Sequence, residues 1–182
     1  MVSMQPQLPI EVDQHTGVWT TDGLPMLYVP RHFFHNLHLS IETAMGRDAY
    51  AAILYPSGHK SAWFWCEQEA KTHNLSGVDV FAHYLKRLSQ RGWGQFSFVR
   101  QELEQGYAEI RAANSSFVLH QQRFNLSSAT PGCYMFAGWW AGAADWVAHN
   151  QGWKHTYQSN ESRCVGCGAP DCCVFTISST NL

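Results

Sequence analysis

Residues 133–150, with the sequence CYMFAGWWAGAADWVAHN, decide the fold of this chain. Their apolar side chains follow helical spacing, yet they cover more than one side of the helix that this spacing predicts. The set comprises Met135, Phe136, Trp139, Trp140, Ala143, Trp146 and Val147. A surface helix has a single apolar stripe, so the pattern predicts a helix that other elements bury on several sides. Such a helix is a candidate to line a ligand pocket or a dimer interface.

The residues after this helix predict two paired strands. Side chains alternate strictly between 153 and 161, and one face carries Trp153, His155, Tyr157, Ser159 and Glu161. A second strand over 172–178 can pair with the first across the loop 164–171. We therefore expect Glu161 on the same face as the aromatic residues.

The residues before the buried helix predict further helices and a hairpin. A short N-terminal stretch has strand character, and helical spacing indicates helices between Pro30 and Gly46, over 49–55, along 63–74 and over 79–88. Pro56-Ser57-Gly58 is predicted to end the second of these helices. Alternation at 96–98 and 108–112 predicts a hairpin. The fold class is therefore α/β (α+β), an antiparallel sheet packed by helices.

The composition is that of one globular domain over residues 1–182. Hydrophobic residues make up 45% and charged residues 14% of the chain, which suits a sizeable core. A net charge of -2 provides no basic field for nucleic acid or an anionic membrane. The most apolar run, 134–148, is too short to span a bilayer and contains Asp145, and the N-terminus lacks an apolar leader. We expect a cytoplasmic protein without nucleic-acid or membrane partners.

Five of the six cysteines lie in the last third of the chain. Without an export signal, such a cluster indicates metal binding or redox chemistry rather than disulfides. Glu161 is followed by Cys164 and Cys172, which paired strands can bring beside it, and Cys133 at the head of the buried helix can complete a tetrahedral set. Three thiolates and a carboxylate suit zinc, and four protein ligands leave no open position. A structural zinc ion is predicted, and Cys66 is predicted to be a core residue.

The thiol cluster also has other interpretations. Cys173 alternates with Phe175 and Ile177 as the last strand requires, whereas Cys172 fits the loop length, and we favour Cys172 as the last ligand. Cys167, in the pattern Cys164-x-x-Cys167, is a further ligand or half of a redox pair. Reduced thiols without a metal and an iron–sulfur cluster are the remaining alternatives.

Motifs along most of the chain resemble one known family. They are the segment from Leu27 through Met45-Gly46 to Leu54, Tyr84-Leu85 to Gly92-Trp93-Gly94, Pro131-Gly132-Cys133 with Gly138 and Gly142, and Glu161-x-x-Cys164 with Gly168 and Cys172. They resemble the 4-vinyl reductase domain, found in bacteriochlorophyll biosynthesis and as the sensor part of aromatic-responsive transcription activators. The resemblance implies zinc ligation by Cys133, Glu161, Cys164 and Cys172. It also implies a ligand-binding fold similar to that of heme-NO-binding and Golgi-trafficking proteins.

The same resemblance implies a function. We expect a zinc-stabilised sensor or accessory domain that binds a small apolar or aromatic molecule, forms a homodimer, acts through a partner enzyme or regulator, and has no catalytic activity of its own. The alternative is a reductase or reductase subunit acting on a vinyl group of a tetrapyrrole, and a third possibility is a cofactor carrier or assembly factor. The sequence shows no nicotinamide or flavin fingerprint, phosphate loop or nucleophile elbow, which favours the sensor.

Aromatic residues of the buried helix and the following strand are the predicted ligand contacts. Trp139 and Trp140 come from the helix, Trp153 and Tyr157 come from the strand, and His155 between them is the expected polar contact. The tryptophan-rich stretch 139–153 also has more apolar surface than one small core needs, which favours a dimer interface.

Three histidines recur every third residue in the first helix. His32, His35 and His38 therefore share one flank. Because no acidic or thiol partner converges on them in the sequence, we expect a solvated or interface flank rather than a second metal site.

Overall fold

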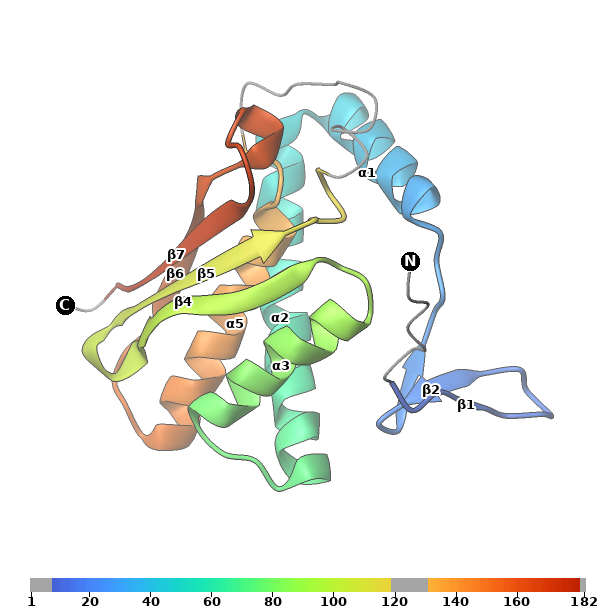
Figure 1. Cartoon of the computed structure of the whole chain (residues 1–182), viewed down its shortest axis with the longest axis horizontal. Coiled ribbons are helices and arrows are strands. Elements are labelled where there is room, and N and C mark those ends of the chain that lie inside the picture. Colours follow the sequence, from blue (N-terminus) through green and yellow to red (C-terminus); the bar gives the residue numbers. More distant parts are fainter. Residues whose placement is uncertain (1–7, 119–130, 181–182) are drawn as a thin grey trace.

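The computed structural model describes residues 8–118 and 131–180, which form two antiparallel sheets and four α-helices (Figure 1). The small N-terminal sheet contains β1 (Glu11–Val12), β2 (Trp19–Thr21) and β3 (Leu24–Met26). Three helices follow it: α1 (Arg31–Met45), α2 (Arg47–His73) and α3 (Val78–Gln90). The strand character of the N-terminal stretch is confirmed.

The main sheet has the order β4-β5-β7-β6, and every neighbouring pair is antiparallel. Its strands are β4 (Gln95–Glu102), β5 (Tyr107–Ala113), β6 (Tyr157–Arg163) and β7 (Cys173–Ser179), with short 3₁₀ turns at Leu103–Gln105 and Val165–Cys167. Helix α5 (Tyr134–Gln151) packs on β6, α3 packs on β4, and α2 covers α5 from the other side (Figure 1). The predicted antiparallel sheet packed by helices is confirmed.

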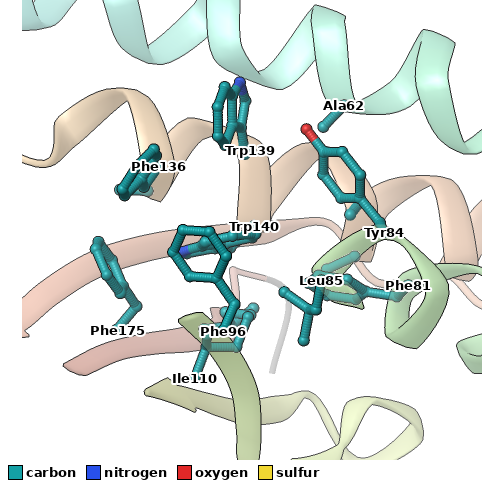
Figure 2. Packing of buried hydrophobic residues seen from close by; sticks show 14 of the residues in the cluster. Ala62, Phe81, Tyr84, Leu85, Phe96, Ile110, Phe136, Trp139, Trp140 and Phe175 are labelled. Carbon is teal, nitrogen blue, oxygen red and sulfur yellow. The ribbon is translucent and has the colours of Figure 1, made fainter. Parts of the chain in front are cut away.

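Helix α5 lies at the centre of the core. The predicted burial on several sides is confirmed, because residues from Phe136 to Ala148 are buried all around the helix. Trp140 has no exposed surface, and its ring centroid lies 5.0 Å from that of Phe96 and 6.0 Å from that of Phe175 (Figure 2).

No helix in the described residues, α5 included, has the length and apolarity needed to cross a membrane.

Two glycines allow α5 to approach α2 closely. A Cβ atom built on Gly138 would lie 2.1 Å from the carbonyl oxygen of Tyr55, and one on Gly142 would lie 2.2 Å from that of His59. Real Cβ atoms do not come this near to a backbone oxygen. The two glycines are one helical turn apart, so they line a single seam along which the backbones of α5 and α2 are in contact.

Helix α2 runs through Pro56, so the prediction of two helices separated at this residue is wrong. Proline removes the hydrogen bond to the carbonyl four residues earlier and usually ends or kinks a helix. Here Pro56 and Ala52 lie on the exposed side of α2, where water can hydrate the freed carbonyl. The opposite side packs on α5 at Gly58, and this tertiary contact outweighs the local preference.

The histidine flank of α1 is more buried than expected. His35 and His38 are only 4% and 8% exposed, so the expectation of a solvated flank is wrong for both. The ring centroid of His38 lies 4.8 Å from that of Phe117 and 5.2 Å from that of Tyr50. Burial lowers the pKa of His38 to about 4, and this histidine is therefore a neutral core residue at neutral pH.

The glycine seam predicts a large effect for a small substitution. Gly138→Ala should lower the free energy of unfolding by about 2 kcal/mol, or roughly 4–8 °C in Tm, because the new methyl group displaces the α2 backbone. Thermal unfolding followed by circular dichroism measures this. Gly132→Ala is the matched control, because no atom of the described residues beyond its chain neighbours lies within 4 Å of its Cβ position. Equal Tm values for the two variants would contradict the seam.

Candidate functional site

A group of thiols and one carboxylate meets where α5 begins. Cys133 is the residue before α5, Glu161 lies in β6, and Cys173 is the first residue of β7. The ligand atoms of these three residues all lie within 4.8 Å of one another. Glu161 pairs with Phe175 across the two strands, and side chains alternate along β7, so Cys173 projects from the same face as Glu161. The pairing of β6 with β7 therefore brings Cys173 to the carboxylate.

Cys164 completes this group. Its thiol has side-chain hydrogen bonds with Cys133, Cys173 and Glu161. The bonds from the two thiols lower the pKa of Cys164 far below its usual range, against the opposing effect of burial. Cys164 therefore adjoins the other three residues. We refer to Cys133, Glu161, Cys164 and Cys173 as the thiol site.

The thiol site fits a zinc ion. Cys133 and Cys173 have no exposed surface, and burial raises the pKa of Cys133 well above its usual value. Glu161 Oε2 accepts the backbone N–H of Cys133 at 2.9 Å, whereas the buried Oε1 has no hydrogen-bond partner in the described part of the chain. Burial raises the pKa of Glu161 to about 7, and Cys164 adds to this effect. A bound cation would give Glu161 Oε1 a partner and would coordinate the closely spaced thiols. Three sulfur ligands and one oxygen ligand suit zinc.

The other cysteines lie outside this group. Cys172 is buried, but its thiol contacts Arg111 on β5, so the structure brings Cys173 and not the favoured Cys172 to Glu161. Alternation in β7 sends adjacent side chains to opposite faces, which explains the difference. Cys167 is exposed, and its thiol has a side-chain hydrogen bond with Cys164. Cys66 is fully buried in the hydrophobic core, as predicted.

The five predicted ligand contacts fall into two separate places. Trp139 and Trp140 lie in the core, where Trp140 packs among Phe81, Phe96, Phe136 and Phe175 (Figure 2). The indole N–H of Trp140 is buried and has no acceptor among the described residues, and the same is true of Trp65. A buried polar atom without a partner is costly, so each N–H is a donor available to a bound molecule.

Trp153 and His155 follow the end of α5, whereas Tyr157 begins β6, and its backbone N–H donates to Asp145 Oδ1 of α5 at 2.6 Å. His155 already has partners, because Nε2 lies 3.1 Å from the carbonyl oxygen of Glu104 and Nδ1 lies 3.2 Å from Ser179 Oγ. The hydroxyl of Tyr157 donates to the carbonyl of Leu103. His155 and Tyr157 fasten β6 to the turn after β4, and within the described residues neither of them makes a ring contact with Trp139 or Trp140.

A surface hollow leads toward the tryptophan core. It lies between α3 and β4, has a volume of about 450 Å³, and is lined in part by Leu85 and Phe96. Phe96 also contacts the ring of Trp140, so the lining of the hollow adjoins the tryptophan core. Alternation and helical spacing identified Phe81, Leu85 and Phe96 as core residues, but nothing in the sequence marked them as neighbours of a candidate site.

Solved structures with this fold include a sensory domain. The crystal structure of the phenol-responsive sensory domain of the transcription activator PoxR with phenol matches with a TM-score of 0.76 and 16% identity, over 93% of this chain and 84% of that one. A vinyl-4-reductase family protein from Methanocaldococcus jannaschii matches with a TM-score of 0.54 and 16% identity, over 86% and 85% of the two chains. Trafficking protein particle complex subunit 3 from Naegleria fowleri, covalently bound to palmitic acid, gives 0.54 and 13%, over 83% and 95%.

These likenesses confirm the predicted resemblance at the level of the fold, both to the 4-vinyl reductase family and to a trafficking subunit. No curated protein matches the sequence. The family model described as "Domain of unknown function (DUF5943)" matches residues 4–99, which is more than half of the 182 residues. By this match, the chain belongs to the DUF5943 family.

Proposed function

We propose that this chain is a sensor or accessory domain for a small apolar or aromatic molecule, stabilised by zinc at the thiol site and without catalytic activity of its own. The observation that carries the proposal is the buried indole N–H of Trp140, which lies inside an aromatic core and has no acceptor in the described part of the chain. The fold likeness to a phenol-responsive sensory domain supports it. Ligand sites of this kind are mostly apolar, with a few polar groups that orient the ligand.

The proposed ligand lies beside Trp140, with a hydroxyl or carbonyl oxygen accepting the indole N–H. Phe96 and Phe175 make edge-to-face contacts with Trp140. An aromatic ligand that enters beside Trp140 would make contacts of the same kind, because ring edges and faces carry opposite partial charges. Entry from the hollow between α3 and β4 requires the ring of Phe96 to rotate away. His155 and Tyr157 already have hydrogen-bond partners. The proposed ligand contacts are therefore the residues around Trp140, in place of Trp153, His155 and Tyr157.

The proposed zinc ion and the ligand share one helix. Cys133 immediately precedes α5, and Phe136, less than one turn later, contacts the rings of both Trp139 and Trp140. An ion that fixes Cys133 to β6 and β7 fixes the start of α5, and hence the aromatic core next to it. We infer that zinc stabilises the ligand site by holding α5 on the sheet.

A homodimer is part of the proposal, but its surface differs from the one expected. Trp139, Trp140 and Trp146 pack within the chain's own core, so they offer no dimer interface. Exposed apolar side chains instead gather before and along α1, where Tyr28 is 87% and Phe33 is 56% exposed. Leu27 and Leu37 extend this apolar surface. A second copy of the chain would remove it from water.

The zinc proposal predicts different effects for substitutions of the adjacent Cys172 and Cys173. Cys173→Ser should remove about one zinc ion per chain and lower the Tm, because a ligand of a closed site is lost. Cys172→Ser is the matched control and should keep the zinc content of the unmodified protein, since its thiol contacts Arg111 instead. Elemental analysis of reduced, dialysed protein measures both. Loss of zinc from the Cys172 variant alone would reverse the assignment.

The ligand proposal predicts binding of phenol next to Trp140. Phenol should raise the Tm by mass action and quench tryptophan fluorescence. Trp140→Phe should weaken binding about tenfold, because one hydrogen bond to the ligand is lost. Trp153→Phe should leave the affinity unchanged. The sensor proposal fails if phenol, alkylphenols and larger aromatics all leave the Tm unchanged.

The dimer proposal predicts that Phe33→Glu yields a monomer. A charge at this half-exposed position disfavours burial against a second copy while leaving the core of the chain intact. Multi-angle light scattering at micromolar concentration measures the molar mass. Val99→Glu on β4, where Val99 is 59% exposed, is the control and should stay dimeric. A monomeric unmodified protein would refute the dimer.

A further inference from the structure

A second cluster of possible metal ligands lies away from the thiol site, where α2 ends. Glu69 and His73 are one turn apart on α2, His83 faces them from α3, and Asp22 reaches them from the turn between β2 and β3. Glu69 Oε2 lies 3.1 Å from His73 Nε2 and 3.0 Å from His83 Nε2. His73 Nε2 lies 3.5 Å from Asp22 Oδ1. We refer to these four residues as the carboxylate–histidine cluster.

These separations match the edges of a metal coordination tetrahedron. Bonds from zinc to nitrogen or oxygen are about 2.0–2.1 Å long, so neighbouring ligand atoms in a tetrahedral site lie about 3.3 Å apart. The measured distances of 3.0, 3.1 and 3.5 Å lie close to this value. The ligand atoms of Glu69, His73 and His83 all lie within 4.8 Å of one another, and Asp22 adjoins this group through His73.

The polar atoms of the cluster are incompletely satisfied. Glu69 has no exposed surface, and its Oε1 has no hydrogen-bond partner among the described residues. Asp22 Oδ2 and His73 Nε2 are also buried without a hydrogen bond there, although His73 Nε2 is so near to Glu69. Close approach without hydrogen-bond alignment is expected where both atoms point at one cation.

Two arginines balance the carboxylates, and one of them occupies a ligand nitrogen that the metal ion would take over. Arg87 Nη2 donates to Asp22 Oδ1 at 2.9 Å, and Arg91 Nη2 lies 3.7 Å from Asp22 Oδ2. Arg87 Nε donates to His83 Nε2 at 3.3 Å, so this nitrogen presents a lone pair to a cation. A metal ion takes the place of the Arg87 Nε donor, while the bond from Arg87 Nη2 orients Asp22.

We propose that Glu69, His73 and His83, with Asp22 as the adjoining carboxylate, bind a divalent transition-metal ion, with zinc as the first candidate, which fastens the turn between β2 and β3 to the end of α2 and to α3. Two imidazoles and two carboxylates are borderline ligands that suit zinc. The side chain of His73 is 29% exposed, so the ion can enter from solvent. The cluster uses none of the residues of the thiol site.

The test counts metal ions in the full chain and in variants of each site. Purified protein is equilibrated with zinc alone, dialysed and analysed for metal, and a parallel sample is loaded with cobalt. The unmodified protein should hold two ions per chain, and His73→Gln should hold one. Thiolate-to-cobalt charge-transfer absorption, which only the thiol site can give, should persist in His73→Gln and vanish in Cys164→Ser. His149→Gln, at an exposed histidine on α5, is the control and should hold two ions.

The outcomes distinguish the two sites. If His73→Gln and a second variant, His83→Gln, hold as many ions as His149→Gln, the carboxylate–histidine cluster does not bind metal and the inference is overturned. If the unmodified protein lacks the charge-transfer absorption but holds one ion that His73→Gln loses, the thiol site fails and the cluster stands. Circular dichroism of each variant ensures that lost metal is not a consequence of unfolding.

Discussion

Helices α5 and α2 pack so closely at Gly138 and Gly142 that the α2 backbone occupies the space of two side chains. This contact fixes the rotation of α5 about its own axis. One side of α5 packs on α2, and Trp140 therefore points toward Phe96 and Phe175 of the sheet. Polar bonds flank the seam, because Trp146 Nε1 donates to Glu67 at 2.9 Å and His59 Nε2 lies 2.7 Å from Asp145. The rest of the structure depends on this position of α5.

The same helix connects the two proposed binding functions. Its start is held by Cys133 at the thiol site, and its second turn supplies Trp139 and Trp140. The helix is rigid, and the glycine seam leaves it little freedom to slide. The start of α5 and the turn with Trp139 and Trp140 are therefore held together, so a change at one affects the other. The carboxylate–histidine cluster lies on α2 and α3, the other two helices of the core, and it ties the N-terminal strands to them through Asp22. The proposed sites thus join segments that are far apart in the sequence.

Much of the fold could be predicted from hydrophobic periodicity. The buried helix, the helix with the apolar face 81–88 and the strands of the main sheet were all predicted, because each has a strong local pattern. Local patterns failed where packing outweighed them. Pro56 predicts a helix end, yet α2 continues because its other side is held by α5. Histidines recur at every third position of α1, which predicts a polar flank. His35 and His38 are nevertheless buried, and His38 packs against aromatic rings.

The sequence by itself determined the fold class, the clustering of thiols around Glu161 and the aromatic character of α5, since these depend on residue type and short-range spacing. Only the tertiary structure placed Cys173 beside Glu161, because the pairing of Glu161 with Phe175 sets which face of β7 meets the carboxylate. It also separated Trp140 from His155, and it brought Asp22 to Glu69, His73 and His83. Spacing along a chain does not determine such contacts, because they depend on how separate elements pack against one another.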